Sequence, residues 1–269
     1  MPELPEVETI VRDLRRDLIG QKIESVRFLN RTVWRKRAPS QKEIVGATVD
    51  RVERRGKHIL VFHSNGRVLI VHLKMTGRLT FEQPSTAIKK HTHLVINLDS
   101  GQLRFNDIRR FGYLDLVRET DIGNLGYLAA LGPDALVVPR DEFTRLLRSK
   151  KRIIKSLLMD QNFLAGMGNI YSDEALFLAG INPRRVSSAI SGIRAGRLYD
   201  AMIEILKRAI DSRGSSMNDY VDARGQKGSF QIHHLVYGKE GKPCPRCGRK
   251  IRRQVIGSRS AHFCPGCQR

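Results

Sequence analysis

The sequence predicts an α+β protein with a β-rich first part, a helical middle and a small cysteine module at the end. Three observations indicate this order. Residues 22–117 form short runs rich in β-branched side chains, the apolar period becomes helical after about residue 120, and all the cysteines follow residue 243. The chain has 269 residues, enough for one large or two modest cores. We place the domain boundaries at 1–120, 121–238 and 239–269.

The first predicted element is a helix that begins near Pro5 and ends before Gly20. Proline is tolerated in the first turn of a helix, and glycine is common just beyond its end. The apolar residues between them recur every three or four positions: Val7, Ile10, Val11, Leu14 and Leu18.

Short strands follow, separated by turn signals such as SNG and DSG. Several strands at this spacing favour an antiparallel sandwich or barrel. The predicted strands are 23–29, 44–56, 58–64, 67–75, 92–101, 102–107 and 112–117.

The middle of the chain has helical periodicity, with Gly, Pro or Asn between the segments. Residues 213–238 are rich in Gly, Ser, Asp and Gln, and they predict a long loop that leads into a short strand at 233–238. The predicted helices are 122–133, 141–149, 152–160, 169–180 and 191–210.

The charge is strongly positive, with 48 Lys and Arg against 27 Asp and Glu and a net charge of +21. Such an excess indicates a polyanionic partner, either nucleic acid or an anionic membrane surface. No apolar run approaches the roughly 20 residues that span a bilayer, and no amphipathic basic helix dominates. The start MPELPEVETI is unlike a secretory or transit peptide. We therefore expect a cytoplasmic, nucleoid-associated protein that binds nucleic acid.

The cysteines form two CxxC pairs, CPRC and CPGC, separated by sixteen residues. This spacing is typical of a zinc ribbon, in which four thiolates hold one structural Zn²⁺ tetrahedrally. A redox CxxC pair is the less favoured alternative, and His262 is not needed as a ligand. The predicted ligands are Cys244, Cys247, Cys264 and Cys267. The basic residues between the pairs favour phosphate contacts: Arg249, Lys250, Arg252, Arg253 and Arg259.

The N-terminal stretch is the most informative part of the sequence. Removal of Met1 leaves Pro2 with a free secondary amine, whose pKa of about 8 leaves far more of it unprotonated than a lysine side chain. On its own, a proline at this position is ordinarily chemically idle. Together with four further features, however, PELPEVET resembles the start of bacterial formamidopyrimidine-DNA glycosylases. Those features are HLKMTG (72–77), NDIRRFG (106–112), GMGNIYSDE (166–174) and the terminal ribbon.

The resemblance covers essentially the whole chain, and it implies a fold and an activity. The implied fold is an N-terminal β-sandwich, a helix–two-turn–helix domain and a zinc finger. The implied activity is excision of 8-oxoguanine and ring-opened purines from double-stranded DNA, followed by strand cleavage at the abasic site. Pro2 would then attack the sugar C1′, Glu3 would protonate the opening ring, Lys57 would serve in acid–base work, and Arg259 would hold phosphate.

The resemblance also implies DNA contacts. Met75, Arg109 and Phe111 would fill the space left by an extruded base. The family usually has proline where this chain has Ile108, so a fixed φ is missing before Arg109. His91, Lys150 and Asn169 match positions that contact the backbone around the lesion. Lys155 and the loop 215–230 match the region near the lesion base, without a specific contact carried over.

Two alternatives remain open at this point. A sister enzyme that removes oxidised pyrimidines usually begins Pro-Glu-Gly-Pro-Glu, and Leu4 argues against it. A non-catalytic binder of damaged DNA would not require Pro2, Glu3 and Lys57, all of which are present. Nothing in the sequence indicates an oligomer, and we expect a monomer.

Overall fold

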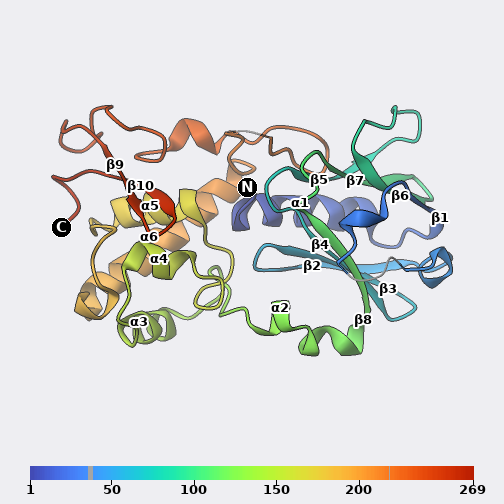
Figure 1. Cartoon of the computed structure of the whole chain (residues 1–269), viewed down its shortest axis with the longest axis horizontal. Coiled ribbons are helices and arrows are strands. Elements are labelled where there is room, and N and C mark those ends of the chain that lie inside the picture. The colour runs from blue at the N-terminus through green and yellow to red at the C-terminus, as the bar shows by residue number, and fades with distance from the viewer. Residues whose placement is uncertain (36–38, 218) are drawn as a thin grey trace. The chain divides into compact units, whose positions relative to one another are not determined.

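The computed structural model describes residues 1–35, 39–217 and 219–269. The chain divides into two compact units. Unit 1 comprises residues 1–130 and 212–229, and unit 2 comprises residues 131–211 and 230–269. Figure 1 shows that unit 1 carries the strands β1–β8 and that unit 2 carries the helices α3–α6 with the hairpin β9–β10. The division of the sequence into three domains at residues 120 and 238 remains a prediction.

Unit 1 is an antiparallel β-sandwich built around α1 (Leu4–Leu18), which confirms the predicted fold class. Both sheets have four strands, so the architecture is a sandwich and the barrel is excluded. One sheet has the order β1-β6-β7-β5, formed by Ile23–Phe28, Thr92–Leu98, Gly101–Asp107 and Gly77–Glu82. The other has the order β2-β3-β4-β8, formed by Val49–Arg55, His58–His63, Arg67–His72 and Tyr113–Arg118.

The helix α1 begins with a capping box. The Glu3 side chain accepts from the backbone of Glu6, and Oε2 of Glu6 accepts from the backbone N–H of Glu3 at 2.8 Å. Pro5 lies in the first turn, where its missing N–H costs nothing. The apolar face of α1 joins the inner faces of both sheets in one core cluster. The first predicted helix is therefore confirmed.

Strand β5 was missed by the sequence analysis. Its alternation of Leu79 and Phe81 with Arg78 and Thr80 is typical of a half-buried strand, but only a short turn separates it from the apolar run of β4. The first residue of β5 is Gly77. Glycine fits this position because a Cβ there would lie 2.5 Å from the Leu73 carbonyl oxygen. The segment 44–48, predicted as strand, contains a turn and an isolated bridge, and β2 starts at Val49.

Short helical turns complete unit 1. The predicted helix 122–133 is reduced to η3 and α2, because Gly123, Gly126 and Gly132 interrupt the helical period. The turns are η1 (Arg31–Val33), η2 (Gln41–Glu43), η3 (Glu119–Asn124) and α2 (Gly126–Ala129).

Unit 2 packs its helices around α5, which is buried at eight of its positions, 170–177. The predicted helices after residue 140 are all present. They are α3 (Arg140–Arg148), α4 (Ile154–Met159), α5 (Asn169–Leu178) and α6 (Gly192–Asp211), joined by the turns η4 (Ser187–Ala189) and η5 (Phe230–His233). The hairpin of β9 (Arg252–Ile256) and β10 (Arg259–Phe263) pairs Arg259 with Ile256. None of the helices in the described ranges is long and apolar enough to cross a membrane.

The strand predicted at 233–238 is wrong. The backbone N–H groups of Leu235, Val236 and Tyr237 donate to the Glu174 carboxylate at 2.8, 3.0 and 2.8 Å instead of to a neighbouring strand. Three successive N–H groups converging on one carboxylate require a curled backbone, which an extended strand cannot supply. The buried Glu174 side chain thereby fastens this segment to α5.

Candidate active site

The predicted nucleophile and its neighbour lie at the buried start of α1. Pro2 is buried, Glu3 is 3% exposed, and Met1 is 46% exposed. The bond from the Glu3 N–H to Glu6 fixes the peptide that follows Pro2. Glu3 therefore stands at a helix N-terminus, which accommodates a carboxylate well.

Lys57 lies at the turn between β2 and β3 and is 6% exposed. Arg54 ties this turn to α1, because its Nε donates to Glu8 at 2.8 Å and its Nη1 donates to the Gly56 carbonyl at 3.0 Å. Burial acts to raise the pKa of Glu8, but hydrogen bonds from Arg54 and Arg12 outweigh it, so the pKa lies below its ordinary value. The Glu8–Arg54 ion pair holds the Lys57 turn against the helix that carries Pro2 and Glu3.

Met75, Arg109 and Phe111 form one exposed cluster at the surface of unit 1. The Arg109 guanidinium lies 4.6 Å from the centroid of the Phe111 ring, and its Nη1 is 3.4 Å from Sδ of Met75. Met75 is 43% exposed and Phe111 is 52% exposed, so neither side chain fills the core. Two apolar groups around one cation form a surface suited to stacking and hydrogen bonding.

Asp107 fixes the loop that carries Arg109, a role that the motif NDIRRFG alone does not indicate. Its fully buried carboxylate accepts from the backbone N–H of Arg109 at 3.2 Å and of Gly112 at 2.7 Å. It also accepts from the hydroxyl of Thr76, next to Met75. Ile108, which stands where the family usually has proline, is 54% exposed. Hydrogen bonds to Asp107 therefore constrain this loop, in which Ile108 supplies no fixed φ.

A second group of side chains, His58, His72 and Tyr113, supports the turn at Lys74 that precedes Met75. Nε2 of His58 lies 2.8 Å from the Tyr113 hydroxyl, and the two imidazole rings are 4.6 Å apart. Nδ1 of His72 accepts from the backbone N–H of Lys74 at 3.0 Å, where φ is 50°. Burial is the main cause that lowers the pKa of His58 to about 4 and that of His72 to about 2. Both rings are therefore neutral at pH 7, and sequence patterns had indicated only strands here.

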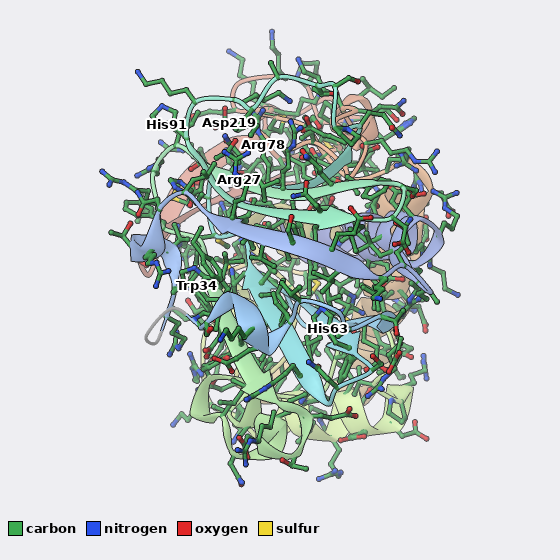
Figure 2. The ribbon with its side chains drawn as sticks, turned by 90° about the vertical axis from the view of Figure 1, so that its right-hand side faces the viewer. Arg27, Trp34, His63, Arg78, His91 and Asp219 are labelled. Carbon is green, nitrogen blue, oxygen red and sulfur yellow. The ribbon has the colours of Figure 1, made fainter. Side chains whose placement is uncertain are left out.

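His91 is exposed at the turn before β6, with a φ of 69°. Its carbonyl accepts from the backbone N–H of Asp107 at 3.0 Å, which links this turn to the Arg109 loop. Figure 2 shows His91 toward the same end of the view as Arg78 and Arg27.

The remaining predicted contacts lie in unit 2. Lys150 is exposed, and Asn169 is partly buried at the first position of α5, after Gly168. Lys155 is fully buried, and its Nζ donates to the Asn169 carbonyl and to Oγ of Ser172, both at 2.8 Å. Nζ also lies 2.7 Å from Asp173, as an ion pair that is not aligned as a hydrogen bond. Lys155 therefore stabilises the start of α5 from inside unit 2.

The four cysteine sulfurs lie within 4.8 Å of one another. Sγ of Cys244 lies 3.8 Å from Sγ of Cys267, and Sγ of Cys247 lies 3.4 Å from Sγ of Cys264. Tetrahedral zinc with Zn–S bonds of about 2.3 Å requires sulfurs about 3.8 Å apart, so this arrangement fits one metal ion.

The rest of the ribbon agrees with this assignment. His262 contacts Asp173 of α5 and is not one of the grouped metal ligands. Its Nδ1 lies 3.1 Å from the Asp173 carboxylate, and its backbone N–H donates to the same carboxylate at 2.8 Å. Arg259 is exposed at the start of β10.

These features define a class of protein: a β-sandwich with a buried N-terminal Pro-Glu pair, followed by a helical unit that includes a four-cysteine ribbon. Known proteins share each part. The N-terminal domain of formamidopyrimidine-DNA glycosylase matches residues 1–114, its H2TH domain matches 131–221, and a zinc finger found in FPG and IleRS matches 241–269. The chain belongs to the formamidopyrimidine-DNA glycosylase family, whose members are DNA-repair glycosylases.

Individual relatives match over the full length. Formamidopyrimidine-DNA glycosylase of Solibacter usitatus is 44% identical, with 100% of both chains covered. The solved complex of Lactococcus lactis Fpg with DNA that contains an abasic site is 35% identical, with a TM-score of 0.92 and 99% of each chain covered. The solved structure of MutM with DNA that contains carbocyclic 8-oxo-G is 34% identical, with a TM-score of 0.91 and 99% of each chain covered.

Proposed function

We propose that this protein removes oxidised purines, such as 8-oxoguanine and formamidopyrimidines, from duplex DNA and then cleaves the strand at the abasic site. The observation that supports this most is the buried Pro2–Glu3 pair at the start of α1 in a member of this family. The solved relatives hold DNA with an abasic site or with an 8-oxo-G analogue, which supports double-stranded DNA as the substrate.

In the proposed reaction Pro2 is the nucleophile. After removal of Met1, its nitrogen lone pair forms a bond to C1′ of the damaged nucleotide, and the electron pair of the C1′–base bond leaves with the base, which takes up a proton. The sugar ring then opens, its ring oxygen accepts a proton from Glu3, and an iminium forms between Pro2 and C1′. The iminium acidifies the 2′ proton, so its removal expels the 3′ phosphate. A second elimination expels the 5′ phosphate.

Lys57 and Arg259 are the proposed assisting groups. Lys57 moves protons during elimination, and its buried place at the turn held to α1 by Arg54 supports that role. Arg259 carries a permanent positive charge on the exposed start of β10, so we assign it to holding phosphate.

The exposed cluster of Met75, Arg109 and Phe111 is proposed to enter the duplex when the damaged nucleotide is extruded. Met75 and Phe111 replace lost stacking, while Arg109 hydrogen-bonds the unpaired opposite base. His91, Lys150 and Asn169 are assigned to the DNA backbone. Their exposed or helix-terminal positions and the net charge of +21 support phosphate contacts.

The metal is proposed to be one structural Zn²⁺, held by Cys244, Cys247, Cys264 and Cys267. It would supply folding energy to the ribbon and take no part in the bond changes. Because the relatives found are bacterial proteins, we place the protein in the bacterial cytoplasm with the chromosome, as a monomer.

Two other functions are distinguished by one experiment. Borohydride trapping is measured on duplexes with a single 8-oxoguanine or a single oxidised pyrimidine, using protein shown to have lost Met1. We expect a covalent adduct and a cut strand on the purine duplex. An adduct on the pyrimidine duplex alone would assign the protein to the sister branch. Binding without an adduct on either duplex would indicate a non-catalytic binder.

The assignment of Pro2 is tested by Pro2→Gly and by a form that retains Met1. We expect both to lose efficient trapping, because neither presents the secondary amine, and to keep most of their DNA affinity. Trapping by SDS gel and affinity by fluorescence anisotropy are measured on the same duplex. Unimpaired trapping by either form would overturn the Pro2 assignment.

A further inference from the structure

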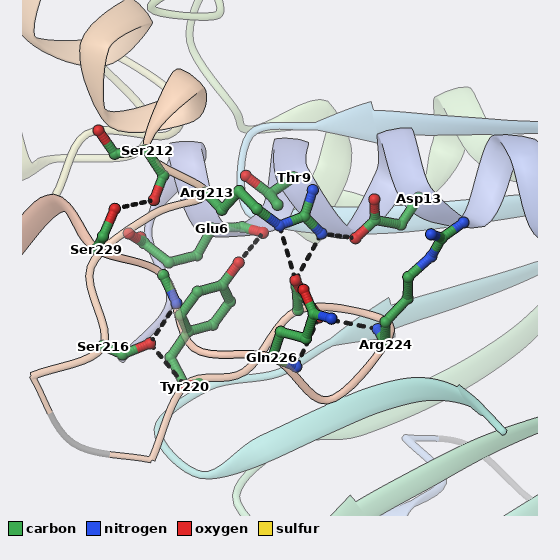
Figure 3. A network of polar contacts seen from close by, with 12 residues as sticks. Glu6, Thr9, Asp13, Ser212, Arg213, Ser216, Tyr220, Arg224, Gln226 and Ser229 are labelled. Atoms are coloured by element: carbon green, nitrogen blue, oxygen red, sulfur yellow. Dashed lines mark hydrogen bonds and ion pairs between the residues drawn. The ribbon is translucent and has the colours of Figure 1, made fainter.

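Residues 212–217 and 219–229 belong to unit 1 and form a loop that closes on itself, the return loop. Its ends meet where the Ser229 N–H donates to the Ser212 carbonyl at 2.9 Å. Within it, the Gly228 N–H donates to Oγ of Ser216 at 2.9 Å. The Ala223 carbonyl accepts from the Phe81 N–H of β5 at 2.8 Å. Figure 3 shows the loop lying along α1.

Arg213 joins the return loop to α1 through two buried carboxylates. Its Nη2 lies 2.5 Å from Oδ2 of Asp13 in α1 and 2.5 Å from Oδ2 of Asp222 in the loop (Figure 3). Nε of Arg213 donates to Asp222 at 2.8 Å. Asp13 is 1% exposed and Asp222 is 0% exposed. Without the guanidinium, the two buried carboxylates would face each other with no cation between them, although Arg16 still pairs with Asp13 and the backbone N–H groups of Arg224 and Gln226 still donate to Asp222.

The backbone at Arg213 is also unusual, with a φ of 59°. A non-glycine residue adopts this conformation only when its surroundings enforce it. The paired carboxylates do so here. The next residue, Gly214, has a φ of 81°, and a Cβ there would lie 2.9 Å from Cγ and Oε1 of Glu6. The loop therefore rests directly on the first turns of α1.

Glu6 connects this contact to the site of chemistry. Oε1 of Glu6 accepts from the Ser215 N–H at 2.8 Å, while Oε2 accepts from the Glu3 N–H at 2.8 Å. Glu6 is 1% exposed. One carboxylate is therefore shared between the return loop and the peptide that follows Pro2, so displacement of the loop at 213–215 changes the support of Glu3.

We infer that Arg213 is a positioning residue that holds the return loop on α1 and, through Glu6, sets Pro2 and Glu3 for reaction. The inference rests on the proposed function for Pro2. Arg213 touches neither substrate nor reacting atom in this scheme. Its loss is therefore expected to slow chemistry while DNA affinity is retained.

Arg213→Gln is the test variant, Arg213→Lys is the conservative variant, and Arg208→Gln is the matched control. Arg208 lies outside the return loop, in α6, where it pairs with Glu204 at 3.3 Å, and its side chain is 46% exposed. An exposed pair of this kind contributes little.

Two measurements are made on full-length protein. Single-turnover borohydride trapping on an abasic-site duplex gives the rate of adduct formation, with affinity read by anisotropy. Amide hydrogen exchange of residues 3–7 and 213–229 reads the coupling without any chemistry. For Arg213→Gln we expect adduct formation about tenfold or more slower, affinity within about threefold, and faster exchange in both segments. Arg213→Lys should recover part of the rate, and Arg208→Gln should match the wild type.

Unchanged exchange at residues 3–7 in Arg213→Gln would overturn the inference, as would a trapping rate equal to that of Arg208→Gln. A parallel loss of rate, affinity and melting temperature would also overturn it, because that pattern marks a general folding defect. If Arg213→Gln does not fold, Arg213→Lys is judged by the same criteria. Failure of the wild type to form an adduct would overturn the proposed function, and exchange would still decide the coupling.

Discussion

Asp107 is a single buried carboxylate that fixes two chain segments, one carrying Met75 and the other Arg109 and Phe111. Truncation to alanine leaves the N–H groups of Arg109 and Gly112 without their acceptor. We expect Asp107→Ala to lower the free energy of unfolding by about 1–3 kcal/mol. Excision should also become less sensitive to the opposite base, because the Arg109 loop is no longer held.

Asp107→Asn is the matched variant, since it keeps an acceptor of the same size. Urea unfolding and excision opposite cytosine or adenine are compared in both variants. Unaltered stability and unaltered opposite-base preference in Asp107→Ala would show that the carboxylate does not support the loop.

His58 and His72 give the stability of the protein a pH dependence. Their pKa values in the fold, about 4 and about 2, lie below the ordinary 6.5. The unfolded chain therefore binds their protons first as the pH falls. The contribution of the two neutral rings to the free energy of unfolding is complete above about pH 6.5. Below that pH it falls by up to about 1.4 kcal/mol per pH unit for each ring, down to about pH 4 for His58 and about pH 2 for His72.

We expect His58→Phe to reduce this acid sensitivity, although the Tyr113 hydroxyl loses its partner. Urea unfolding between about pH 7 and about pH 5 checks the difference in slope between wild type and variant. Parallel slopes would mean that His58 is already protonated in the fold at these pH values.

At the scale of the element, β5 depends on close packing at its first residue, which a short sequence pattern does not reveal. Gly77 is the first residue of this strand, and a Cβ there would lie 2.5 Å from the Leu73 carbonyl oxygen. Gly77→Ala must therefore displace the turn that carries Met75, at an expected cost of about 1–3 kcal/mol. Gly123→Ala is the control, because a Cβ there meets nothing within 4 Å. Thermal unfolding that is equally affected in both variants would contradict this account.

Secondary structure could be predicted where periodicity decides it, as in α1 and β3, whose side chains pack into the core. It could not be predicted where a distant side chain decides it. Residues 235–237 read as a strand, but Glu174, more than sixty residues away, takes their N–H groups. No local window contains that information.

The residues of the candidate site also fall into two groups, those that could be predicted from the sequence and those that could not. The resemblance supplied the roles of Pro2 and Glu3. The spacing of the two CxxC pairs supplied the four cysteines, which the structure brings together. The supporting residues were not found, because their partners lie far along the chain. Arg213 and Asp13 are an example, since 200 positions separate them.

At the scale of the whole molecule, zinc and charge together govern DNA affinity in the proposed function. Removal of the metal should leave four crowded thiols and release the basic hairpin of β9 and β10. We expect weaker DNA binding and a shallower dependence of log affinity on log salt, because fewer phosphates are neutralised. Anisotropy across a salt series, before and after chelation and after zinc is restored, checks this. Identical salt slopes would exclude the ribbon from the contact.

Two neighbouring residues of α5 give the four-cysteine module its attachment. Glu174 holds residues 235–237, and Asp173 holds His262, so adjacent buried carboxylates receive all these groups. A chain shortened before residue 235 would leave both carboxylates inside unit 2 with those partners removed. The module is thus unsuited to deletion or to exchange for the equivalent piece of another protein, unless the donor's backbone meets α5 in the same way. A chimera joined within 180–234 would separate α5 from the ribbon, so an exchanged segment has to begin before α5 and carry both.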